Sequence, residues 1–164
     1  LLERVPALRM SHQLVLPTGR EAAAIASAQL QALFGKYLKE GERDEFKLAL
    51  IEALENAVVH GNLELSSDLK DQDWGAFEQA IVDRSSDDHY NRRTITIEAT
   101  CDSERLSISI EDQGQGFDHN NLPDPADPES LLRASGRGLL LIQFAMNEVG
   151  WNASGNRIEM VKYL

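Results

Sequence analysis

Hydrophobic and polar residues alternate along five stretches of the chain, which is the pattern of β-strands with one buried face. The predicted strands cover residues 10–16, 94–101, 104–111, 148–152 and 157–164. The first is expected to end at Pro17. The second and third should form a hairpin around Asp102 and Ser103, and the last two should close the chain as a second hairpin.

Apolar residues recur at helical spacing elsewhere, predicting helices over 20–38, 42–60 and 139–149. Thr18 is placed to cap the first helix, with Glu21 as the acidic partner of a capping box. Gly61 should stop the second helix. Residues 66–88 are polar and acidic, and they fit either a short helix near 71–84 or a mobile insertion. Helices on one face of a mostly antiparallel sheet make an α+β two-layer sandwich.

The third predicted strand runs directly into Asp112, which is followed by Gly114 and Gly116. Glycines at these positions let the chain turn sharply or pass close to a ligand. A carboxylate held beside such a hollow can accept a hydrogen bond from an exocyclic amine, such as that of adenine. The same spacing also occurs in ordinary turns, so the motif alone leaves a purely structural role open.

Glu52 and Asn56 are four residues apart on the second predicted helix and therefore share one face, which His60 extends. An amide oxygen can ligate Mg²⁺ beside a phosphate, and a carboxylate can orient or deprotonate a nucleophile. Ala53 and Ala57 leave room for a ligand beside the pair. The alternative is an exposed polar face of an amphipathic helix.

Gly136, Arg137 and Gly138 lead into an apolar helix that begins at Leu139. Unpaired amides at a helix N-terminus approached by glycines suit a phosphate. The stretch is neither a Walker loop nor a dinucleotide fingerprint, because the required lysine and third glycine are missing. A glycine cap of the helix is the structural alternative.

Glu-x-x-x-Asn-Ala, Asp-x-Gly-x-Gly-Phe and Gly-x-Gly-Leu, in this order, resemble the N, G1 and G2 boxes of the GHKL ATPase superfamily, which includes gyrase and histidine kinases. More narrowly, residues 56–62 and 124–142 are similar to the anti-sigma-factor serine kinases of bacterial partner-switching systems. The resemblance runs from about residue 14 to 164. It implies one ATP-binding domain over 1–164, of the GHKL (Bergerat) fold.

The resemblance also implies roles for individual residues. Glu52 would be the catalytic or water-positioning carboxylate, Asn56 the Mg²⁺ ligand, and Asp112 the acceptor for the adenine amine. Arg133 or Arg137 would supply positive charge at the γ-phosphate, because Ala134 stands where the related kinases often carry arginine. The remaining nucleotide-binding positions would be Gly114, Gly116, Gly136, Gly138, Leu139 and Asn156, the last replacing a common threonine.

Comparison with the same family points to two further segments. Residues 63–93 are longer than the usual link between the N box and the next strand and form an insertion. Residues 118–135 lie where the superfamily keeps its ATP lid, and their three prolines prevent one continuous helix.

The composition limits the classes of molecule that are expected to bind the protein. A formal charge of −11 argues against nucleic acid or an anionic membrane as a partner. It fits a basic protein partner, or simply an acidic surface. The single cysteine, Cys101, excludes an internal disulfide and suits a reducing cytoplasm, and the four histidines show no paired metal-ligand spacing.

The expected function is that of an ATP- and Mg²⁺-dependent protein serine/threonine kinase in signal transduction. Its substrate would be a small antagonist protein, and a sigma factor or similar regulator would compete for it. Two alternatives stay open: a nucleotide-sensing module of a larger signalling protein with negligible turnover, and the catalytic domain of a histidine kinase. The oligomeric state is also open, with a homodimer among the alternatives.

Overall fold

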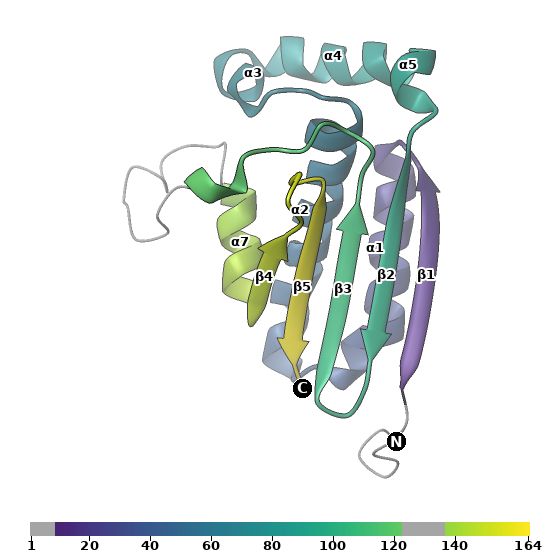
Figure 1. Ribbon diagram of the computed structural model, residues 1–164, viewed down its shortest axis with the longest axis vertical. Coiled ribbons are helices and arrows are strands. Elements are labelled where there is room, and N and C mark those ends of the chain that lie inside the picture. The colour runs from purple at the N-terminus through teal and green to yellow at the C-terminus, as the bar shows by residue number, and fades with distance from the viewer. Residues whose placement is uncertain (1–8, 123–136) are drawn as a thin grey trace.

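Five strands form a single sheet in the order β1-β2-β3-β5-β4, with every pairing antiparallel (Figure 1). The computed structural model describes residues 9–122 and 137–164. The strands are β1 (Met10–Pro17), β2 (Thr94–Cys101), β3 (Arg105–Glu111), β4 (Glu148–Trp151) and β5 (Arg157–Tyr163). These bounds confirm the predicted strands and both hairpins, and with the helices they confirm the α+β fold.

The helices α1 (Arg20–Phe34), α2 (Arg43–Glu55) and α7 (Arg137–Ala145) cover one face of this sheet, behind it in Figure 1. Short 3₁₀ turns follow α1 (Gly35–Tyr37), precede α2 (Glu40–Glu42) and lie after β3 (His119–Asn121). None of the helices in the described residues is both long and apolar enough to cross a bilayer.

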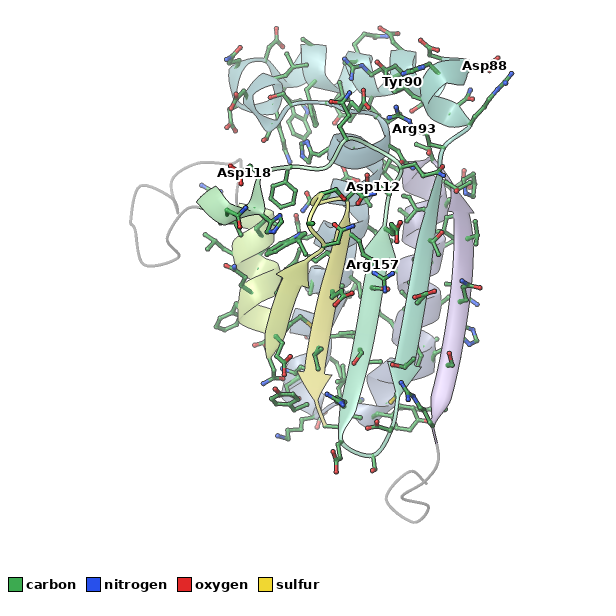
Figure 2. The ribbon with its side chains drawn as sticks, in the orientation of Figure 1. Asp88, Tyr90, Arg93, Asp112, Asp118 and Arg157 are labelled. Carbon is green, nitrogen blue, oxygen red and sulfur yellow. The ribbon has the colours of Figure 1, made fainter. Side chains whose placement is uncertain are left out.

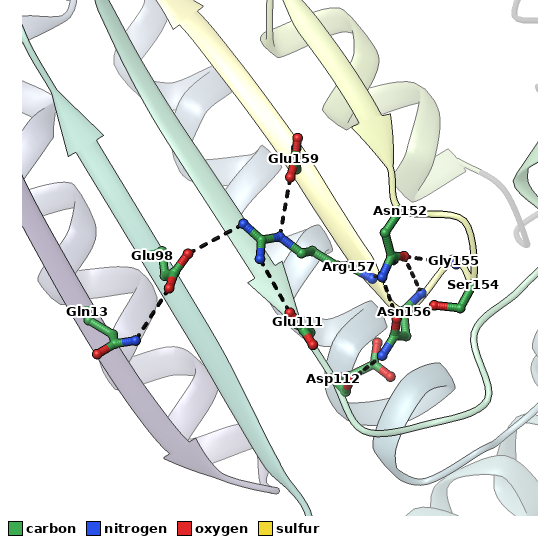
Figure 3. A network of polar contacts seen from close by, with 10 residues as sticks. All are labelled: Gln13, Glu98, Glu111, Asp112, Asn152, Ser154, Gly155, Asn156, Arg157 and Glu159. Atoms are coloured by element: carbon green, nitrogen blue, oxygen red, sulfur yellow. Dashed lines mark hydrogen bonds and ion pairs between the residues drawn. The ribbon is translucent and has the colours of Figure 1, made fainter.

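The alternation of the strands separates a buried face from an open one. The inward side chains of the two central strands are at most 1% exposed: Ile95, Ile97, Ala99, Cys101, Leu106, Ile108 and Ile110. On the open face Arg157 lies among three carboxylates, those of Glu98, Glu111 and Glu159, at 3.3–3.5 Å (Figure 3). One solvated face explains why the strands alternate rather than read as continuous apolar runs.

The second helix does not stop at Gly61 as predicted. α2 ends at Glu55, and the chain continues as a π-helical segment, Asn56–Asn62. The amide of Leu63 donates to the carbonyl of Val58, five residues back, at 2.9 Å. π-helical turns of this kind occur frequently at functional sites.

Asn62 ends the π-helical segment with a fully buried side chain. Its amide nitrogen donates to the Thr18 hydroxyl at 2.9 Å and the Thr94 carbonyl at 3.1 Å. Its amide oxygen accepts from the backbone N–H of Gln113 at 2.7 Å. A single carboxamide therefore joins the helical layer to the starts of α1 and β2 and to the loop after β3.

This network overturns the predicted cap of the first helix. The N-cap residue of α1 is Gly19, and no side chain caps it. Thr18 instead donates its hydroxyl proton to the Arg93 carbonyl at 2.6 Å and accepts from Asn62. The Thr18 hydroxyl bonds the Asn62 amide rather than the N-terminus of α1. A buried amide without a hydrogen-bond partner costs more free energy than helix amides that water can solvate.

The insertion is folded, which confirms the helical alternative for residues 66–88. It consists of α3 (Ser67–Gln72), α4 (Trp74–Ser85) and α5 (Asp88–Asn91), and it crosses one end of the sandwich (Figure 1). The predicted single helix is split because Asp73 takes an extended conformation and caps α4, accepting from the amide of Ala76 at 3.0 Å. Ser66 and Asp87 cap α3 and α5 in the same way.

The third predicted helix is shorter than expected. α7 ends at Ala145, because the amide of Asn147 already donates to the Val161 carbonyl, at 2.8 Å, beside the β4–β5 pair. Of the predicted lid, residues 118–122 are described. The rest of the lid, including Arg133 and Ala134, lies outside the described residues, as does Gly136 of the third motif.

Asn62→Ala should lower the free energy of unfolding by about 1–3 kcal/mol, because it removes a buried carboxamide and leaves the Thr94 carbonyl and the Gln113 N–H without this partner. Urea unfolding measures this change. Gln79→Ala is the matched control, since that exposed amide bonds only Asp83 on the surface of α4; its effect should stay within about 0.5 kcal/mol. Equal effects of the two substitutions would contradict the assignment of Asn62 as the central contact.

Candidate functional site

A cavity of about 350 Å³ opens between α2 with its π-helical continuation, the ends of β3 and β5, and the start of α7. Seven of the predicted site residues line it: Glu52, Asn56, Asp112, Gly116, Gly138, Leu139 and Asn156. Gly114 and Arg137 are described but are not part of the lining. The cavity therefore unites residues from all three sequence motifs.

Asp112 is held in the cavity by contacts on both sides. Its backbone N–H donates to the Asn156 carbonyl, and the Asn156 side-chain amide donates to the Asp112 carbonyl, each at 2.9 Å (Figure 3). Its carboxylate accepts from the N–H of Gly114 at 2.8 Å. A Cβ at Gly61 would lie 2.7 Å from the carboxylate oxygen Oδ1. Gly61 is therefore required for the approach of Asp112, and not for ending a helix.

Burial raises the pKa of Asp112 from its ordinary value near 3.8 to about 6. The hydrogen bond from Gly114 and the positive charge of Arg93 oppose this shift, while Glu111 adds to it. Figure 2 shows Asp112 at the end of β3, below the segment that carries Tyr90 and Arg93. Above pH 6 the group is mainly ionised and can act only as a hydrogen-bond acceptor.

The side chain of Asn156 is committed to the β4–β5 turn. Its Oδ1 accepts from the Asn152 amide and the Ser154 hydroxyl, both at 2.7 Å, while its Nδ2 holds the Asp112 carbonyl (Figure 3). Asn156 lines the cavity, but its observed contacts serve to position Asp112.

Two glycines in the left-handed region allow the loop after β3 to pack against this turn. Gly116 has φ 75° and Gly155 has φ 77°. A Cβ at Gly116 would lie 2.7 Å from the carbonyl carbon of Ser154, and one at Gly155 would lie 2.8 Å from the amide nitrogen of Phe117. Protein backbone thus occupies the space that these glycines leave.

Glu52 lies farther back along the same helix face, one turn before Asn56. Burial raises the pKa of its carboxyl group, with Lys70 and His60 opposing and Glu55 adding to the shift. A Cβ at Gly138 would lie 3.4 Å from the Glu52 carboxyl carbon and closer still to Oε2. The start of α7 can meet Glu52 only because residue 138 is glycine.

A family model described as the histidine kinase-like ATPase domain matches residues 17–162. The chain belongs to this family. A comparison with curated proteins found no match.

The cavity fits the nucleotide that this ATPase family implies. Asp112 touches the helix at Gly61, whereas Gly138 meets it at Glu52, nine residues earlier. Because residues 56–62 are π-helical and rise less per residue than an α-helix, the two contacts are on the order of 10 Å apart. This separation suits an extended nucleotide with its base at Asp112 and its phosphates near Glu52. The cavity volume also lies in the range of small-molecule sites, about 300–1,000 Å³.

The donor set of the ATPase cavity also fits a magnesium ion. Within residues 9–122 and 137–164, no three histidine, cysteine, aspartate or glutamate side chains cluster as a metal cage. Magnesium in phosphate sites is commonly held by one or two protein oxygens plus phosphates and water. The side chain of Asn56, which lines the cavity, offers such an oxygen.

No role in the site was predicted from the sequence for several residues that line the cavity: Gly61, Leu65, Ser66, Ser67, Lys70, Phe117, Trp151 and Gly155. Ser66, Ser67 and Lys70 come from the insertion, whose polar sequence carries no signal for a buried site. Trp151 meets the Phe117 ring edge-on at 5.7 Å. Gly155 lies in a turn sequence, and this was the only feature of the sequence that could have drawn attention to it.

His60 has its tautomer fixed by the fold. Its Nδ1 lies 2.6 Å from the Leu65 carbonyl oxygen, which can only accept, so Nδ1 carries the proton. His60 lines the cavity together with Glu52 and Asn56 as their spacing predicted.

The pKa of Asp112 gives the nucleotide-free protein a specific pH dependence. Because folding raises this pKa from about 3.8 to about 6, the group's favourable contribution is complete below pH 4 and is lost as pH rises through 6. Relative to Asp112→Asn, the wild-type free energy of unfolding should therefore fall on the order of 1–3 kcal/mol between pH 4 and 7. Urea unfolding of both proteins across this pH range tests it, and parallel curves would contradict the raised pKa.

Proposed function

We propose that this histidine kinase-like ATPase domain is a protein serine/threonine kinase of the anti-sigma-factor type, transferring phosphate from ATP to a small antagonist protein. The observation that carries the proposal is the place of Glu52. It is a partly buried carboxylate with a raised pKa, about two helical turns from the Asp112 end of the cavity and in contact with the start of α7.

Glu52 can take the proton of an incoming serine or threonine hydroxyl. The hydroxyl oxygen then bonds to the γ-phosphorus, the bond from that phosphorus to the β–γ bridging oxygen breaks, and ADP leaves. Phosphoryl transfer depends mainly on positioning and charge neutralisation, so few protein groups are required. A raised pKa brings a carboxylate closer to the value that favours proton acceptance near neutral pH.

The other site residues support nucleotide recognition in this proposal. Asp112 accepts a hydrogen bond from the adenine amine, and Gly114 and Gly116 let the ring approach the backbone of the loop. Asn56 holds magnesium, which neutralises phosphate charge when bound. The phosphates face the start of α7, where Arg137, Gly138 and Leu139 lie; Arg133 and Gly136 would join them.

The assignment to the anti-sigma type rests on the sequence similarity of residues 56–62 and 124–142. The acidic charge of −11 complements a basic protein partner. A sigma factor or similar regulator is then the competing partner, in the cytoplasm, with a homodimer as one possible assembly.

The insertion favours a second candidate function. Ser66, Ser67 and Lys70 line the cavity from α3 and its cap, so nucleotide occupancy can be relayed to the insertion without turnover. A nucleotide-sensing module would use the same ATP site. A histidine kinase would use the same ATP site together with a phosphoacceptor histidine on a dimerisation helix; His12, His60, His89 and His119 occupy a strand, the π-helical segment and short helical turns.

Adenine recognition by Asp112 can be measured by titration calorimetry with ATP and GTP. Asp112→Asn should weaken ATP binding by about 1.5–3 kcal/mol, the contribution of a hydrogen bond to a charged group. GTP should bind wild type more weakly, because guanine carries an oxygen where adenine carries the amine. Asp102→Asn is the matched control: its carboxylate also accepts backbone amides, of Glu104 and Arg105, but in a turn far from the cavity. Equal affinity for ATP and GTP would exclude the adenine assignment.

Glu52→Gln should reduce phosphate transfer by about 10²–10⁴-fold, the usual contribution of a general base, while ATP affinity changes little. Labelled ATP and candidate antagonist proteins from neighbouring genes provide the assay. Glu55→Gln is the control, since that carboxylate pairs with Arg20 at 2.7 Å outside the cavity lining. If ATP binds normally and no antagonist protein is phosphorylated, the sensing module replaces the kinase.

A further inference from the structure

The insertion is tied to the end of the π-helical segment by two arginines. Arg84 donates to the carbonyl oxygens of Leu63 and Glu64 at 2.6 and 2.7 Å, and Arg93 pairs with the Glu64 carboxylate at 2.9 Å. Both guanidinium groups lie over the Tyr90 ring, 5.0 and 5.5 Å from its centroid. Glu64, which has φ 52°, is thus held in a conformation unusual for a residue with a side chain. The chain enters α3 from a fixed point.

From this point α3 directs Lys70 into the cavity. The lysine Nζ lies 5.6 Å from the Trp74 ring centroid and 5.9 Å from that of Phe77, both on α4. It lines the cavity together with Glu52 and is close enough to that carboxylate to lower its pKa against the effect of burial. The ammonium group therefore lies over an aromatic surface and within electrostatic reach of the proposed proton acceptor.

The charges that line the cavity suggest a role for Lys70. Among the described residues that line the cavity, Lys70 is the only lysine or arginine, and it accompanies two carboxylates, Glu52 and Asp112. A nucleoside triphosphate would add several negative charges to this wall. Phosphates in proteins are bound by charge-assisted hydrogen bonds from lysine and arginine. The flexible four-carbon stem of lysine lets the ammonium group turn from the rings towards such a ligand.

We propose that Lys70 binds the phosphates of the nucleotide, which makes the inserted helices α3 and α4 part of the nucleotide site. The inference rests on the ATP binding in the proposed function and specifies which side chain neutralises the phosphates. Because Lys70 is supplied by the insertion, the insertion senses the phosphate chain rather than the base. The triphosphate then links α3 to the nucleotide site in a way that adenosine does not.

The test compares ATP with adenosine by titration calorimetry on the full chain. Lys70→Met keeps the aliphatic stem against Trp74 and Phe77 but removes the charge. It should weaken ATP binding about 10- to 100-fold, as expected for loss of a hydrogen bond to a charged group, and leave adenosine affinity unchanged. Lys70→Arg should restore most of the ATP affinity. Lys36→Met is the matched control, because Lys36 also lies over an aromatic ring, that of Tyr37 at 5.1 Å, outside the cavity lining.

The outcomes separate this inference from the proposed function. ATP affinity of Lys70→Met within twofold of wild type overturns the inference, and so does an equal loss for ATP and adenosine, which would make Lys70 a support of the cavity wall. Lys70→Gln serves as the second neutral variant if near-ultraviolet circular dichroism shows that the methionine variant is misfolded. Failure of wild type to bind ATP at all would overturn the proposed function first, whereas ATP binding without phosphate transfer leaves the Lys70 result interpretable.

Discussion

The buried carboxamide of Asn62 is the contact on which the rest of the site depends. Its three hydrogen bonds join the helical layer to the loops at one end of the sheet. A buried amide must satisfy its donors and acceptor inside the protein, and the partners available are the chain segments around the cavity. The π-helical segment places this amide beneath the loop that follows Asp112. The position of the proposed adenine acceptor is therefore a consequence of satisfying one polar group in the core.

Close backbone approach is the second constraint. Gly61 and Gly138 let the helical layer meet the carboxylates of Asp112 and Glu52, while Gly116 and Gly155 let two loops pack against each other. A Cβ at any of these four positions would lie within 3 Å of a neighbouring atom, so each close approach requires glycine.

The site is acidic on its described walls, which is unusual for a nucleotide. Burial raises the pKa of both Asp112 and Glu52 because neither has a cation in direct contact among the ion pairs of the described residues. Positive charge must therefore be supplied to the phosphates from other segments. In our proposal the insertion supplies this charge through Lys70. The family resemblance implies that Arg133 or Arg137 supplies the rest.

The sequence by itself determined the strands, the hairpins, most of the helical segments and the order of the three motifs, and hence the fold. Those features depend on residues within a few positions of one another, where periodicity is directly readable. Tertiary structure decided the rest. Thr18 bonds partners 44 and 75 residues away and so does not cap α1, and Gly61 serves the carboxylate of Asp112 instead of ending a helix. Lys70 lines the cavity from α3, and Arg84 and Arg93 hold the chain just before this helix. No local pattern records such contacts, because each depends on which segments the folded sheet and helices bring together.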